Sequence, residues 1–206
     1  GIVYGLYATS SGIGGITIIQ ATNKLCDIGG PLLLTGKQGD VMKESMNVSL
    51  TCALSKCSKQ SLQKYELNNN LTETSNTTLI NSINTNEKDK KKNLSLHIHC
   101  PDNATPKDGP SAGCAITIAI ISIIENKPIS NKYSMTGEID LQGNVLPIGG
   151  LSSKILGSKN SGIYNVIIPR KNKKDLDKIK EKQAQLLEEM TIIMVEKIDE
   201  IIKLVF

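Results

Sequence analysis

A single serine in a stiff turn is the first residue of this sequence that could do chemistry. Ser111 lies in Pro106–Gly113, which reads PKDGPSAG, and an apolar stretch from Cys114 to Ile124 follows it. Proline fixes φ, and glycine allows backbone geometry that other residues resist. If the apolar stretch is a helix, Ser111 lies at its start, where N–H groups and the helix dipole favour a developing negative charge. The same position is typical of a serine N-cap, so both roles stay open at this point.

Two kinds of base could activate such a serine. His97 and His99 alternate along a predicted strand and so share one face, and Asp108 would complete a Ser-His-Asp triad. Lys154 is the stronger candidate, because it follows Pro147–Gly150 in the first turn of a predicted helix. An ordinary lysine has a pKa of about 10.4 and stays charged at neutral pH. Burial and a helix N-terminus would both lower that pKa, so Lys154 could act as the general base of a Ser-Lys dyad.

These residues need elements to hold them, and hydrophobic periodicity predicts a mixture of strands and helices. Asp40 is the predicted N-cap of one helix, and Gly162 is the predicted stop of another. The predicted strands are 2–8, 16–21, 32–35, 94–100, 135–139, 144–148, 165–168 and 191–195. The predicted helices are 40–56, 114–126, 151–159, 175–189 and 198–206. Their alternation after residue 94 predicts one compact α+β, or mixed α/β, domain.

Composition excludes several function classes. The 206 residues are 39% hydrophobic but only 3% aromatic, so the core must be aliphatic. The net charge of +4 shows no basic face interleaved with aromatics, so nucleic-acid binding is not indicated, and no apolar stretch is long enough to span a membrane. Five cysteines without a C-x-x-C pair favour a reduced compartment. No third ligand stands at a recognisable spacing from His97 and His99, so no metal site is predicted.

One stretch differs in kind from the rest of the chain. Residues 66–93 are rich in asparagine, serine and threonine and contain a lysine run at 88–92. Such a segment buries too little apolar surface to offset its ordering entropy. It is therefore interpreted as a disordered surface insertion without a catalytic role, and the lysine run as a solvated stretch, with a binding arm as the alternative. Because the chain opens directly on a strand-like segment without an initiator Met, we also expect it to be a domain of a longer protein.

Several motifs resemble those of one protein family. Pro106–Gly113 resembles the catalytic-serine signature of the Lon family of ATP-dependent proteases. Met135–Ile139, followed by Leu146–Leu151 and Lys154, resembles that family's catalytic-lysine signature in the same order. Further matching blocks lie at 34–45, 97–99 and 168–176. The resemblance covers nearly the whole chain outside the insertion and has the LonA form, although Ser152–Ser153 replaces a charged pair that commonly precedes the lysine.

The resemblance implies a role for each matched residue. Ser111 would attack the scissile carbonyl, and Lys154 would take its proton and later protonate the leaving amine. Thr136 would hydrogen-bond Lys154 and orient it. Backbone N–H groups near Ser111, with the turn of Gly149 and Gly150, would hold the oxyanion. The groups that would shape the site around the dyad are Asp108, Glu138, His97 and His99.

The resemblance also implies a setting. The fold would be the Lon proteolytic-domain fold, ribosomal protein S5 domain 2-like, over residues 1–206. The domain itself would hold no cofactor, and ATP with Mg²⁺ would act through an upstream AAA+ ATPase domain. Substrates would be unfolded polypeptides, the assembly a homo-hexameric ring, and the location the mitochondrial matrix. The alternatives are a non-proteolytic Lon-like oligomerisation domain and a Ser-His hydrolase of small substrates.

Overall fold

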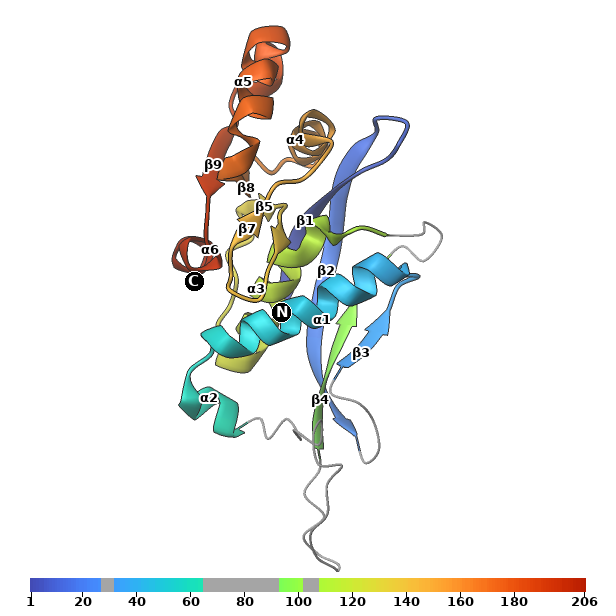
Figure 1. Cartoon of the computed structure of the whole chain (residues 1–206), viewed down its shortest axis with the longest axis vertical. Coiled ribbons are helices and arrows are strands. Elements are labelled where there is room, and N and C mark those ends of the chain that lie inside the picture. The colour runs from blue at the N-terminus through green and yellow to red at the C-terminus, as the bar shows by residue number, and fades with distance from the viewer. Residues whose placement is uncertain (27–31, 65–92, 102–107) are drawn as a thin grey trace, which may run out of the picture.

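A seven-stranded mixed sheet organises the fold (Figure 1). The computed structural model describes residues 1–26, 32–64, 93–101 and 108–206. The strand order in the sheet is β3-β4-β2-β1-β5-β8-β9, and β6 and β7 form a separate two-stranded sheet. The strands are β1 (Ile2–Ala8), β2 (Gly14–Cys26), β3 (Leu32–Thr35), β4 (Asn93–His99), β5 (Tyr133–Met135), β6 (Glu138–Ile139), β7 (Val145–Leu146), β8 (Asn165–Pro169) and β9 (Thr191–Val195).

Helices cover both faces of this sheet. The α-helices are α1 (Asp40–Lys56), α2 (Lys59–Lys64), α3 (Gly113–Glu125), α4 (Leu151–Asn160), α5 (Lys173–Lys182) and α6 (Ile198–Val205). The short 3₁₀ helices are η1 (Pro110–Ala112), η2 (Arg170–Asn172) and η3 (Ala184–Leu187). The predicted mixed α+β domain is confirmed. None of the described helices has both the length and the apolar character that crossing a membrane requires.

Strand directions bring several strand ends to one edge of the sheet. β1 runs antiparallel to β2 and parallel to β5, and β5, β8 and β9 are all parallel. The carboxyl ends of β1, β5 and β8 therefore meet at the same edge. In open sheets of this kind, ligands bind beyond the carboxyl ends of the strands.

The core has two parts, one on each face of the sheet. Side chains alternate between the faces of a strand. On β8, Ile167 belongs to the apolar cluster formed with α1, α3 and α6. Val166 and Ile168, its neighbours in sequence, belong to the cluster formed with α4 and α5. The helices thus form two layers, which we call the α1–α3 layer and the α4–α5 layer.

Helix α3 is the most buried helix of the α1–α3 layer. Its sequence, GCAITIAIISIIE, is apolar on every side, as expected for a helix without a solvent face. It packs between the sheet and α1, whose buried residues include Met42, Met46, Leu50 and Ala53 (Figure 1). The prediction of a helix here is confirmed.

Helix α1 begins differently from the prediction. Asp40 is not its N-cap: Gly39 occupies that position, and the exposed Asp40 side chain pairs with Lys43 at 3.1 Å. The capping oxygen comes from elsewhere in the chain, because Asp108 Oδ1 accepts the backbone N–H of Met42 at 3.0 Å. A Cβ on Gly39 would lie 2.4 Å from the Asp108 carboxyl carbon, so a larger residue at position 39 would displace the carboxylate from this capping position.

Several other predicted segments have different bounds. The strand predicted over 16–21 is longer, as β2, and the one predicted over 144–148 is shorter, as β7. The segment 135–139 is not one strand: it divides into β5 and β6 at Thr136–Gly137, where the backbone turns toward η1. The segment 175–189 divides into α5 and η3. Asn93 belongs to β4, where it pairs with Cys26, and not to the insertion. The remainder of the predicted insertion lies outside the described residues.

Candidate active site

Ser111 lies in η1, at the entrance to α3, and its side chain is half-buried. Its carbonyl oxygen accepts two hydrogen bonds, from the N–H of Gly137 at 2.9 Å and from Thr136 Oγ1 at 3.1 Å. The N–H of Cys114 donates in turn to the carbonyl of Gly137 at 3.0 Å. The turn that carries Ser111 is therefore joined to the carboxyl end of β5. Ser111 is not an N-cap, since Gly109 and Ala112 hold the cap positions of η1 and α3.

Two glycines permit this close approach. A Cβ on Gly137 would lie 2.7 Å from Cys114 Sγ, and one on Gly113 would lie 3.0 Å from the backbone nitrogen of Ile139. Real Cβ atoms essentially never lie as close to a neighbour as the Cβ at position 137 would, and the contact of a Cβ at position 113 would be unusually tight. The backbone of the serine turn and the backbone after β5 can therefore hydrogen-bond only because neither position has a side chain.

Lys154 comes from the opposite helix layer. It lies in the first turn of α4, is only 2% exposed, and its Nζ donates to Thr136 Oγ1 at 3.1 Å. Burial lowers the pKa of the Lys154 amine from 10.5 to about 8. Among the residues that the structure describes, no carboxylate forms an ion pair with it. A large fraction of this lysine is consequently neutral slightly above physiological pH, with a lone pair that can accept a proton.

The first turn of α4 is placed by the loop before it. Gly150 is the N-cap of α4 and has a φ of +67°, a conformation that strains other residues. One residue before Gly149, the backbone of Ile148 is paired on both sides by the Asn172 side chain. Asn172 Oδ1 accepts the Ile148 N–H at 3.0 Å, and Nδ2 donates to the Ile148 carbonyl at 2.8 Å.

The positioning contact of Asn172 was missed by reasoning from the sequence. Asn172 is 2% exposed, and its Nδ2 also donates to Asp175 Oδ2 at 2.8 Å. Asn172 lies in the family block at 168–176, but the resemblance implies no role for it in the site. The sequence offers one indication, which is an amide side chain shortly after the end of a buried strand. That indication does not identify the backbone group to which the amide binds.

Thr136 connects the two halves of the site. Its hydroxyl has one proton, which it donates to the carbonyl of Ser111, and its oxygen accepts the N–H of Lys154. With these two bonds, the threonine fixes the Lys154 amine relative to the backbone of Ser111. The arrangement links a desolvated amine, through Thr136, to the backbone of the turn that carries Ser111, at the carboxyl edge of the sheet. A serine and a lysine of this kind are residue types that acyl-transfer sites use.

The other predicted site residues lie around this pair in different ways. Asp108 is exposed, and its Oδ1 accepts the N–H groups of Met42 and Gly109. It therefore caps α1 and orients no histidine in the described residues. Glu138 is the half-buried first residue of β6, immediately after Gly137.

The two histidines form a separate cluster around Thr35. Thr35 Oγ1 lies 2.8 Å from His97 Nε2 and 2.7 Å from His99 Nδ1. Leu96 and Ile98 of the same strand enter the α1–α3 cluster, so the imidazoles face the other side of the sheet. Strands β2 and β1 separate β4 from β5, a spacing of about 14 Å. The geometry therefore does not favour a Ser-His reading.

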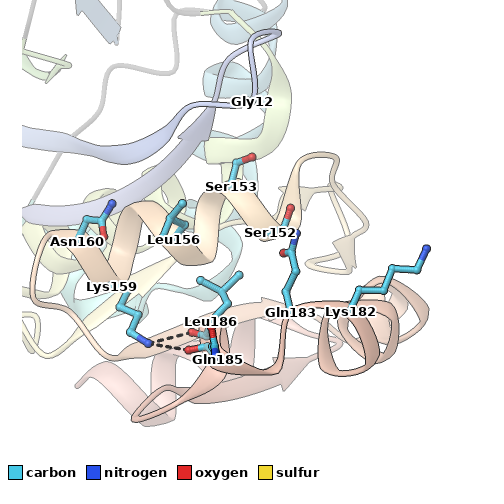
Figure 2. A pocket seen from close by; sticks show the side chains of 10 residues that line it. All are labelled: Gly12, Ser152, Ser153, Leu156, Lys159, Asn160, Lys182, Gln183, Gln185 and Leu186. Atoms are coloured by element: carbon cyan, nitrogen blue, oxygen red, sulfur yellow. Dashed lines mark hydrogen bonds between the residues drawn. The ribbon is translucent and has the colours of Figure 1, made fainter.

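A groove of about 640 Å³ lies on the outer side of α4. Figure 2 shows it between Gly12, at the tip of the β1–β2 hairpin, and η3. Inside the groove, Lys159 Nζ donates hydrogen bonds to the carbonyl oxygens of Gln185 and Leu186, at 3.0 and 3.5 Å. Ser152 and Ser153 line the groove. Neither Ser111 nor Lys154 lines this groove, and Lys154 is on the buried side of the same helix. No group of three or more possible metal ligands occurs in the described part of the chain.

Comparison with known proteins gives a consistent match along the whole chain. The family model for the Lon protease (S16) C-terminal proteolytic domain matches residues 1–74 and 67–206. Lon protease of Lachnoclostridium phytofermentans is 41% identical over 205 residues, covering 98% of this chain and 21% of the relative. Lon protease of Clostridium beijerinckii is 41% identical over 203 residues, with coverages of 98% and 21%. Lon protease of Mycoplasma mycoides subsp. mycoides is 37% identical over 206 residues, with coverages of 100% and 22%.

These relatives correct one expectation and set the scale of the whole protein. They are bacterial Lon proteases, so the prediction of a mitochondrial matrix location is wrong. The expectation combined the family resemblance with the asparagine- and lysine-rich composition of the insertion, and neither of these reports the location of this protein. The chain spans about a fifth of the length of these relatives.

Proposed function

This chain belongs to the Lon protease family as its C-terminal proteolytic domain, and we propose that it cleaves peptide bonds with Ser111 as the nucleophile and Lys154 as the general base. The observation that carries the proposal is the link from a buried lysine, through Thr136, to the backbone of a turn-borne serine. Burial lowers the pKa of the amine to about 8, which is the property that a lysine base requires.

The reaction would run in two acyl-transfer steps. Ser111 Oγ attacks the scissile carbonyl carbon while its proton passes to the neutral Lys154 amine. The tetrahedral intermediate then collapses, the C–N bond breaks, and the Lys154 ammonium gives its proton to the leaving amine. A water molecule next attacks the Ser111 ester and loses a proton to Lys154, which returns that proton to the serine as the acid product leaves.

Four features would support this chemistry. The first N–H groups of the η1–α3 segment lie at the positive end of a helix dipole, where the oxyanion would be stabilised. The turn of Gly149 and Gly150 precedes the lysine helix and would contribute to the same environment. Thr136 would hold the amine so that its lone pair faces the serine hydroxyl. Asn172 would act through the Ile148 peptide, as a positioning residue for that turn.

The activity of the whole protein extends beyond these residues. We propose that ATP and Mg²⁺ act through an AAA+ ATPase domain in the part of the protein that the relatives have and this chain does not cover. The substrates would be unfolded polypeptides delivered to a hexameric ring of these domains. ATP would then drive delivery of the substrate, and the bond-breaking step would need only the residues described above.

The proposal is tested by cleavage of a fluorogenic, unstructured peptide by the intact protein with ATP and Mg²⁺. Ser111→Ala should lower kcat by at least about a thousandfold, because the change removes the proposed nucleophile. Circular dichroism and the thermal midpoint serve as the folding control, because a serine-to-alanine change in the turn should leave both unchanged. Peptide cleavage by Ser111→Ala at the wild-type rate would refute the assignment of the nucleophile.

A further inference from the structure

Two serine hydroxyls of α1 reach the backbone of the turn that carries Ser111. Ser45 Oγ donates to the carbonyl oxygen of Pro110 at 3.4 Å. Ser49 Oγ donates to the carbonyl oxygen of Gly113 at 3.1 Å. The two carbonyls lie on either side of the nucleophile in the chain. Helix α1 therefore contacts the nucleophile turn through side chains that take no part in proton transfer.

Both serines are in an unusual position for their residue type. They are 8% and 0% exposed, and they stand one helical turn apart on the same face of α1. A serine within a helix commonly bonds a carbonyl of its own helix. Ser55 of the same helix does so, because its Oγ donates to the Cys52 carbonyl at 2.7 Å. Ser45 and Ser49 direct their protons out of the helix and into the turn.

A third contact extends this face by another turn of the helix. The backbone N–H of Met42 donates to Asp108 Oδ1, and the same oxygen accepts the N–H of Gly109. We call Met42, Ser45 and Ser49 the α1 clamp. Its three donors bind acceptors that follow the order of the turn, from the aspartate before the nucleophile to the glycine after it.

The opposite side of the turn is held by the groups after β5. The carbonyl of Ser111 accepts from Thr136 and Gly137, while the carbonyls of Pro110 and Gly113 accept from the α1 clamp. Successive peptide groups of the turn are therefore fixed from two directions. A rotation of the turn toward Lys154, or away from it, would break bonds on one side.

We propose that Ser45 and Ser49 are positioning residues, whose hydroxyls keep Ser111 aligned with the Lys154 amine. The inference rests on the proposed function, because alignment has a catalytic meaning only if these two residues form the dyad. Loss of alignment by about 1 Å can cost on the order of a hundredfold in rate. The clamp hydroxyls would act on kcat and leave substrate binding unchanged, since they lie beneath the turn and touch no open surface.

The test is the double variant Ser45→Ala/Ser49→Ala in the intact protein with ATP and Mg²⁺. We expect kcat for an unstructured peptide to fall about tenfold or more while KM stays within about twofold. Titration with a peptidyl boronate counts the competent sites, so that misfolded protein is not mistaken for slow catalysis. Amide hydrogen exchange should become faster in a peptide spanning 108–114 and stay unchanged in one spanning 191–206.

Two matched variants sharpen the comparison. Ser55→Ala makes the same chemical change on the same helix without touching the turn, so both its kcat and its exchange should equal those of wild type. Ser45→Thr keeps the hydroxyl at the less buried of the two positions and should recover activity relative to Ser45→Ala. The proposal is overturned if the double variant keeps wild-type kcat, or if exchange over 108–114 does not change.

A failure of the proposed function would look different. Ser111→Ala would then retain activity, and the clamp would no longer have a dyad to align. Hydrogen exchange over 108–114 would still report whether α1 holds the turn. Wild-type kcat in the double variant together with an inactive Ser111→Ala would refute the positioning role alone.

Discussion

Two clusters in this domain each place nitrogen bases against a threonine hydroxyl, and they differ in what the threonine connects. Thr136 accepts from Lys154 and donates to the carbonyl of Ser111, so it joins a base to the segment that carries a nucleophile. Thr35 lies between His97 and His99 and joins them only to each other and to β3. The first cluster is suited to catalysis, whereas the second is suited to holding an edge of the sheet.

The hydrogen-bond donors and acceptors of the Thr35 and Thr136 clusters also differ. The Thr35 hydroxyl has one proton, so it can donate to only one of the two imidazole nitrogens, and the other nitrogen must donate to it. One histidine therefore accepts a hydrogen bond from the Thr35 hydroxyl, and the other donates one to it. The Lys154 amine keeps its lone pair when it donates to Thr136, so it can still accept a proton. Side-chain type is therefore a poor guide to which nitrogen acts as the base.

The largest difference between the clusters should appear on removal of each base. Lys154→Ala should lower peptide cleavage by at least about a thousandfold, because the change removes the proposed general base. His97→Ala and His99→Ala should each leave kcat within about threefold of wild type, after correction for any unfolded fraction. Initial rates on an unstructured peptide measure all three. A histidine variant as inactive as Lys154→Ala would overturn the contrast.

The pH profile should identify the same base without mutation. The pKa of Lys154 is lowered to about 8 by burial, and its neutral form is the reactive one. We expect kcat/KM to rise about tenfold per pH unit below that value and to level off above it, so that the rate at pH 6 is about a hundredfold below the plateau. A profile already level above about pH 6.5 would instead indicate a histidine base.

Burial of Lys154 should also cost stability. Its pKa is about 8 in the folded state and 10.5 in the reference state, so the native state binds fewer protons between these values, and stability rises with pH across that interval. Lys154→Met, which needs no proton, should therefore stabilise the domain by about 1–3 kcal/mol at pH 7. Urea denaturation at several pH values measures this.

The stabilisation should disappear as the pH rises above about 10.5, where the amine becomes neutral in both states. Lys159→Met is the matched control, because Lys159 is a partly exposed lysine of the same helix that donates to backbone carbonyls at a surface groove. A destabilised Lys154→Met at pH 7 would mean that the bond to Thr136 outweighs the cost of burying the amine.

The smallest expected effect compares the two threonines directly. Thr136→Val keeps the side-chain shape but removes the bond to Lys154, and should lower kcat by about tenfold through a less well-oriented amine. Thr35→Val should leave kcat unchanged and cost about 1–2 kcal/mol of stability, because it leaves ring nitrogens without a partner. Steady-state kinetics and denaturation of both variants make the comparison. Equal effects on kcat would show that orientation by Thr136 does not matter.

The parts of the fold that follow from local periodicity were predictable from sequence. The bounds of β1 (Ile2–Ala8), β3 (Leu32–Thr35) and α1 (Asp40–Lys56) agree with the prediction, because each has a clear apolar pattern between turn residues. The strand predicted over 135–139 divides at Thr136 and Gly137, because the Gly137 N–H donates to Ser111 of η1 and the Gly137 carbonyl accepts from Cys114 of α3. No local pattern contains that information.

The candidate site shows the same limit. The residue types of Ser111 and Lys154, and the family motifs around them, singled out two positions. The sequence could not indicate that the Asn172 side chain pairs with the Ile148 peptide, or that Ser49 bonds the Gly113 carbonyl. Asparagine and serine occur throughout this chain, and only the packed structure determines which peptide each one binds.

The two proposed partners of the dyad belong to opposite layers of the molecule. Ser111 lies directly before α3, in the α1–α3 layer, and Lys154 lies on α4, in the α4–α5 layer. The apolar clusters of these two layers lie on opposite faces of the sheet. Neither layer alone contains a complete dyad. If the proposed dyad is the catalytic centre, a newly synthesised or partly unfolded chain in which one layer has not docked would not hydrolyse its neighbours. Completion of the tertiary fold would then serve in the way that removal of a propeptide serves a zymogen.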